Sequence, residues 1–116
     1  MRAALRGAYE LELREAERLL ADDDLRGAFG RLERAHVLGQ RSTTAHVRAH
    51  WAMLRLAWRH RDVREVRGQV GRILGAALVT WLWVPDGNTG GANVSAFRPM
   101  EIPQDLRRLL DTDRAV

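Results

Sequence analysis

Apolar residues recur every three or four positions along most of this chain, which is the spacing that gathers them on one face of an α-helix. This periodicity predicts helices over residues about 2–21, 24–38, 43–60, 62–83 and 103–111. Asp24, Ser42 and Asp62 stand where the second, third and fourth helices would begin, and short polar side chains of this kind cap helix N-termini. Pro85 would end the fourth helix.

The same spacing predicts which side chains face the core. On the third helix the predicted inward stripe runs from His46 to Trp58, and on the fourth it includes Val63 and Val70. Tryptophans at helical spacing more often pack in the core or at its rim than bind a ligand. We therefore expect the tryptophans of this chain to be packing residues.

Two of the predicted turns resemble each other. Residues 20–24 and the helix that follows align with residues 58–62 and their helix, at an offset of roughly 38 residues, against roughly 34 in tetratricopeptide repeats. The pattern predicts an all-α single domain over residues 1–116, built from two antiparallel, tetratricopeptide-like helical hairpins. A glycine-rich wrap over residues 85–102 and a short final helix would complete it.

The predicted wrap is polar and rich in glycine, unlike the rest of the chain. It lacks the Gly-Lys-Ser/Thr sequence of a phosphate-binding loop and follows no strand, which disfavours nucleotide binding. Two interpretations stay open: a rigid structural segment held by its own hydrogen bonds, or a contact with a ligand or partner.

Composition limits the chemistry that the chain can perform. The 116 residues suit one domain, and because cysteine is absent, any metal ligands must be His, Asp or Glu. The formal net charge is +4, and the arginines alternate with acidic residues along the helices, which disfavours nucleic-acid binding.

The chain also lacks the usual signals of export or membrane insertion. Its first residues contain no apolar segment typical of a signal peptide, and the apolar run at residues 73–84 is too short to span a bilayer. We therefore expect a cytoplasmic protein without a membrane partner.

Histidine provides the strongest functional signal. His46 and His50 are four residues apart, so both lie on one face of the third helix. His36 lies a similar distance before the turn that follows the second helix. If those helices are antiparallel, the three imidazoles converge on one point, whereas His60 stands at a turn between arginines and is expected to be solvated.

Two carboxylates are predicted to lie near this cluster. Glu12 falls inside the apolar arc of the first helix, and Glu33 precedes His36 with the Glu-x-x-His spacing used in di-iron helical bundles. Because that motif occurs once, a mononuclear site fits better than a binuclear one. The sequence predicts a site for a divalent first-row metal, with zinc, iron, manganese and nickel left open.

An alternative interpretation needs no metal. The three histidines would then form a hydrogen-bonded polar network in the core, and the exposed helix faces of a tetratricopeptide-like module would bind a protein partner. Peptidase activity is disfavoured, because the His-x-x-x-His pair lacks the glutamate that follows the first histidine in zinc proteases.

Three segments of the chain carry a family resemblance: His-Val-Leu-Gly-Gln at residues 36–40, His46 with His-Trp-x-Met-Leu at 50–54, and the glycine-rich segment with its following Phe-x-Pro-Met at 87–100. Together they resemble a family of small bacterial proteins known only as a domain of unknown function. The resemblance spans nearly the whole chain but implies no activity.

Overall fold

The computed structural model describes residues 1–79, 90–91 and 99–114, and this part of the chain is all-α. Its five helices are α1 (Ala3–Ala21), α2 (Leu25–Gly39), α3 (Thr43–Arg59), α4 (Val63–Val79) and α5 (Gln104–Arg114). The expected end of the fourth helix at residues 80–83 lies outside the described residues, as does most of the expected glycine-rich wrap.

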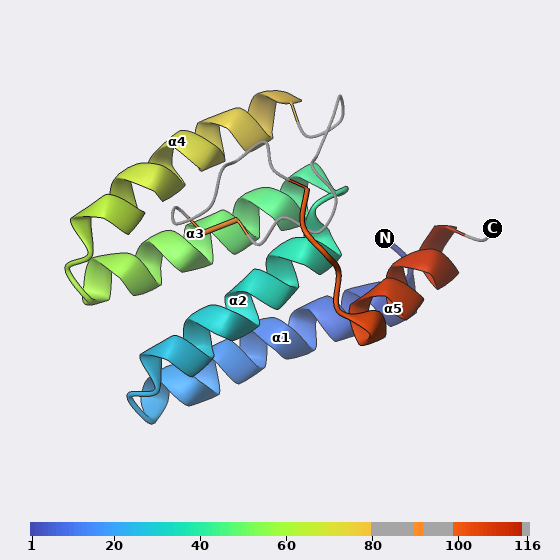
Figure 1. Ribbon diagram of the computed structural model, residues 1–116, viewed down its shortest axis with the longest axis horizontal. Helices are drawn as coiled ribbons and strands as arrows, with labels where there is room; N and C mark the ends of the chain where they lie inside the picture. The colour runs from blue at the N-terminus through green and yellow to red at the C-terminus, as the bar shows by residue number, and fades with distance from the viewer. Residues whose placement is uncertain (80–89, 92–98, 115–116) are drawn as a thin grey trace.

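The first four helices lie side by side in chain order, each running opposite to the one before it (Figure 1). In this arrangement α2 and α3 are the inner pair, and α5 packs across one end of α1 and α2. The two ends of the described chain meet there, because the backbone N–H of Arg2 donates to Asp113 Oδ1 at 2.7 Å. Because α2 and α3 are the inner pair of helices, side chains from them that point towards each other are well enclosed.

The turns after α1 and α3 have the same construction, as their sequences predict. Asp23 and Arg61 occupy equivalent positions and adopt left-handed backbone angles, with φ of 58° and 54°. The next residue in each turn caps the following helix: Asp24 accepts from Gly27 N at 3.0 Å, and Asp62 accepts from Glu65 N at 3.1 Å.

The core lies mainly between α1, α2 and α3. Tyr9 of α1 reaches across it, and its hydroxyl donates to the carbonyl of Ala45 at the start of α3, at 2.7 Å. Gly39 allows this approach, because a Cβ there would lie 2.9 Å from Tyr9 Cε2 and 3.0 Å from Ala45 Cβ. The end of α2 and the beginning of α3 are thereby held close together.

Some of the predicted inward faces are wrong. Trp58 and Val63 are 73% and 67% exposed, and Val70 is also exposed, whereas Gln69 is completely buried. On α4 the reason is the rotation of the helix, which turns Gln69 instead of Val63 and Val70 towards His50 and Met53 of α3. Trp51 is exposed as well, while Trp81 and Trp83 lie outside the described residues.

None of the helices in the described part of the chain is both long enough and apolar enough to cross a membrane.

Candidate metal centre

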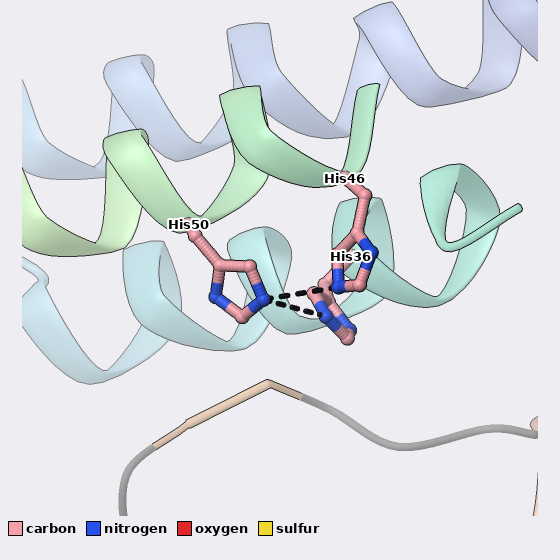
Figure 2. A group of neighbouring side chains, drawn as sticks. All are labelled: His36, His46 and His50. Atoms are coloured by element: carbon pink, nitrogen blue, oxygen red, sulfur yellow. Dashed lines mark hydrogen bonds between the residues drawn. The ribbon is translucent and has the colours of Figure 1, made fainter. Parts of the chain in front are cut away.

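Three histidines from two helices meet in the interior (Figure 2). His36 lies in the last turn of α2, while His46 and His50 lie on successive turns of α3. The chain reverses between these helices at residues 40–42, where the Ser42 side chain accepts from Ala45 N at 3.4 Å. All three imidazoles are buried, with 8% or less of each residue exposed.

The rings approach one another through their Nε2 atoms. His50 Nε2 lies 3.1 Å from His36 Nε2 and 3.0 Å from His46 Nε2, and Figure 2 shows both contacts as dashed lines. One nitrogen of each ring lies within 4.8 Å of the other two. The convergence predicted from helical spacing is therefore present.

Gln69 of α4 fixes the proton position on His50. The amide Nε2 of Gln69 donates to Glu65 Oε1 at 2.6 Å and to the carbonyl of Gly90 at 2.9 Å, and both of these groups are acceptors. The amide oxygen must therefore face His50, whose Nδ1 lies 2.6 Å away and must donate its proton. A neutral His50 then has its lone pair on Nε2, the atom at the centre of the cluster.

Burial keeps the imidazoles of His46 and His50 neutral. Desolvation lowers the pKa of His46 to about 4. The pKa of His50 is also lowered to about 4, chiefly by desolvation and then by the neighbouring His46, with Arg72 contributing and the hydrogen bond to Gln69 opposing. Neutral imidazole is the form that binds a metal, so near pH 7 these ligands need not first lose a proton.

Gly90 lies directly against the ring of His36 in the histidine cluster. It is buried with a left-handed φ of 84°, and a Cβ at this position would lie 2.6 Å from Cδ2 of His36. Only glycine fits both the backbone angle and the contact. The described part of the glycine-rich segment thus packs directly on a candidate ligand.

Glu12 is buried, as its position in the apolar arc of α1 predicts, but it does not join the three histidines. Its carboxylate accepts from Arg31 Nη1 at 3.1 Å and from Arg34 Nε at 2.9 Å. Arg34 in turn pairs with Asp105 of α5. Glu12 thus forms ion pairs with two arginines of α2 and ties α1 to α2.

Glu33 lies one helical turn before His36 and is half-buried, but it too lies outside the group of three histidines. Burial and the nearby carboxylate of Glu65 raise its pKa. The two acids therefore stand near each other on α2 and α4, and Glu65 is the one that binds Gln69. His60, by contrast, is exposed at the turn after α3.

The sequence pattern of the family described as "Protein of unknown function (DUF3703)" matches residues 3–110 of this chain. The chain belongs to the DUF3703 family. Neither a curated protein nor a solved structure matches it. The matched range includes α1 to α4, the first part of α5 and the histidine cluster.

The spacing of the nitrogens in the DUF3703 chain is close to that of a metal site. Metal–nitrogen bonds of about 2.0–2.1 Å place two ligands roughly 3.3 Å apart in a tetrahedral site and roughly 3.0 Å apart in an octahedral one. The two contacts at His50 match these values. The nitrogens of His36 and His46 lie within 4.8 Å of each other, so these two rings would have to approach each other to share one ion.

Two residues of the DUF3703 site were missed by reasoning from the sequence. Gln69 was overlooked because a polar residue on an amphipathic helix is ordinarily assigned to the solvent side. Gly90 was assigned to the glycine-rich wrap, but its contact with the histidine cluster was not foreseen. The Gly90–Gly91 pair was a usable signal, because glycine is preferred where a chain adopts a left-handed backbone angle and where it passes close to a bulky ring.

Proposed function

We propose that this protein binds a single divalent first-row transition metal ion through His36, His46 and His50. Zinc, iron, manganese and nickel all accept imidazole nitrogen, and the three rings offer no further discrimination between them. The observation that carries the proposal is the meeting of three buried Nε2 atoms, one of them with its lone pair set by Gln69.

A metal explains this arrangement better than a hydrogen-bonded network does. An imidazole Nε2 has one lone pair, yet two other ring nitrogens lie 3.0 and 3.1 Å from that atom of His50. In a network the two N–H groups would compete for the same lone pair. One cation satisfies all three lone pairs together.

The outer contacts resemble those of known metal sites in kind. A ligating histidine usually donates its other N–H to an oxygen that orients the ring, and Gln69 performs this task for His50. Glu33 and Glu65 would supply negative charge beside the ion without binding it directly. Three protein ligands would leave a coordination position for water or a small molecule.

Metal content tests the proposal directly. Protein expressed without a histidine tag and dialysed against metal-free buffer should retain about one equivalent of metal, measured by elemental analysis. The double variant His46→Ala/His50→Ala should lose it, and His60→Ala, which alters the exposed histidine, should not. His46→Gln provides a milder variant if the double variant fails to fold.

Two results would contradict the proposal. One is sub-stoichiometric metal that stays unchanged in the double variant. The other is wild-type protein that takes up no zinc, cobalt or nickel when titrated against a weak competing chelator. The cytoplasmic location expected from the sequence stays a prediction.

A further inference from the structure

Helix α3 has two functional faces. His46, His50 and Met53 form its buried stripe. Arg48, Trp51, Arg55 and Arg59 recur at spacings of three and four residues on the opposite side, and each of these four residues is exposed. A substitution on this second face therefore leaves the histidines in place.

The second face of α3 forms one wall of a groove whose other wall is α1. The groove encloses about 200 Å³. The floor of the groove is apolar. It is formed by Leu13, Ala16 and Leu20 of α1 and by Leu56 of α3. Trp51 stands at the edge of the groove with 54% of its surface exposed. A molecule lying in the groove would cover this exposed surface.

The groove is positively charged at its rim. Arg48, Arg55 and Arg59 line it, against a single lining carboxylate, Glu17. Arg48 is already held by Glu10, through an Nη2–Oε2 contact of 3.2 Å. No ion pair within the described residues involves Arg55 or Arg59, so two guanidinium groups beside an apolar floor are available to a ligand.

We infer that this groove binds an acidic peptide segment of a partner protein. An apolar side chain of the peptide would pack on the leucine floor against Trp51, and its carboxylates would pair with Arg55 and Arg59. Arginine forms two parallel hydrogen bonds to a carboxylate, and arginine and tryptophan are the residues that most often dominate binding energy at interfaces.

A nucleic acid fits this groove less well than an acidic peptide does. Phosphate binding is favoured by a continuous cationic track, whereas here Glu17 lies among the arginines and Arg48 is neutralised by Glu10. The floor consists of aliphatic side chains, while single-stranded nucleic acids stack their bases on several aromatic rings. The apolar floor with a cationic rim matches a segment that alternates apolar and acidic residues.

The experiment uses an array of fluorescein-labelled peptides of about 12 residues that vary the spacing between one leucine or tryptophan and three glutamates. Binding to the full chain is followed by fluorescence anisotropy. At least one peptide should bind, and Arg55→Glu/Arg59→Glu should weaken it about tenfold or more. The matched control is Arg107→Glu/Arg108→Glu on α5, which makes the same change in net charge at exposed positions and should weaken it less than about twofold.

The tryptophans provide a second matched pair. Trp51→Ala should weaken peptide binding, whereas Trp58→Ala should not, because Trp58 is exposed but lies outside the groove. Three results would overturn the inference: no peptide of the array binds, both double charge reversals weaken binding equally, or an oligothymidylate binds through Arg55 and Arg59 more tightly than any peptide. Metal content is measured on the same variants and should not change, so this inference can fail while the metal proposal stands.

Discussion

At the scale of single residues, Gln69 decides what the histidine cluster can do. Its amide is buried and uses both ends: the nitrogen donates to Glu65 and Gly90, and the oxygen accepts from His50. Reversing the amide would place its N–H groups against His50 and its oxygen against two other acceptors. The environment of Gln69 therefore selects the His50 tautomer whose lone pair faces the other two rings.

Replacing Gln69 with leucine should weaken metal binding about 10- to 100-fold, the usual cost of losing the group that orients a ligand. The free energy of unfolding should also fall by about 1–3 kcal/mol, because the buried N–H of His50 loses its acceptor. Isothermal titration with zinc and chemical denaturation measure the two effects.

Tyr9→Phe is the control for this substitution. It removes another buried hydrogen bond, to the carbonyl of Ala45, and should lower stability by about 1 kcal/mol while zinc affinity is retained. Equal zinc affinity in wild type and the Gln69→Leu variant would show that Gln69 does not orient a ligand.

Gly90→Ala should destabilise the protein and weaken metal binding together. Its methyl group would collide with the His36 ring, and its backbone angle is unfavourable for any residue with a Cβ. Gly71→Ala is the opposite case, because a Cβ at this helical position meets nothing within 4 Å and alanine favours helix by about 0.5–1 kcal/mol. Melting temperatures that fall in both variants would contradict this explanation.

Helical spacing predicted the meeting of His36, His46 and His50, because it depends only on periodicity and one reversal of the chain. It did not predict the partners of Glu12. Arg31 and Arg34 have long side chains that reach a buried carboxylate from the surface, and no pattern of apolar positions reveals that reach.

At the scale of elements, the two equivalent turns and the rotation of α4 position the site. The turns reproduce each other from the left-handed residue to the N-cap. The rotation of α4 was not predictable from its sequence, because valine and leucine occupy more than one of its faces. Contact with the histidine cluster gives Gln69 the inward position.

Arg61→Gly should stabilise the protein by up to about 1 kcal/mol, because arginine is strained at a φ of 54° and glycine is not. Asp23→Gly, at the equivalent turn, should increase stability less, because aspartate tolerates the left-handed region better than arginine does. Thermal or urea denaturation of the two variants provides the comparison. A loss of stability in Arg61→Gly would contradict it.

At the scale of the whole molecule, the buried histidines make stability depend on pH. The pKa values of His46 and His50 fall from 6.5 to about 4 on folding, so the unfolded chain binds more protons than the native protein between these values. The metal-free protein should therefore lose stability as pH falls from 6.5 towards 4, and the contribution of these two histidines should level off below 4.

The expected loss is a few kcal/mol, because one pKa unit corresponds to about 1.4 kcal/mol. Urea denaturation at a series of pH values measures it. His46→Gln should flatten the dependence, and His60→Gln, at an exposed position, should leave it unchanged. A wild-type stability that is constant from pH 7 to pH 4 would mean that the rings are not buried in the neutral form.

The all-α class was predictable from periodicity, and the repeated turn was predictable from its own residues. The exposed positions of Trp58 and Val63 were not. Periodicity identifies an apolar face but not whether another element covers it, and in the described part of the chain α4 packs against one helix only, α3.

The most direct test of the central claim is the zinc X-ray absorption spectrum of the tag-free protein loaded with one equivalent of zinc. We expect nitrogen and oxygen ligands at about 2.0–2.1 Å, with outer-shell scattering from three imidazole rings. The His46→Ala/His50→Ala variant, treated with zinc in the same way, should give the spectrum of hydrated zinc without imidazole scattering. A wild-type spectrum of hydrated zinc, without imidazole scattering, would contradict the account.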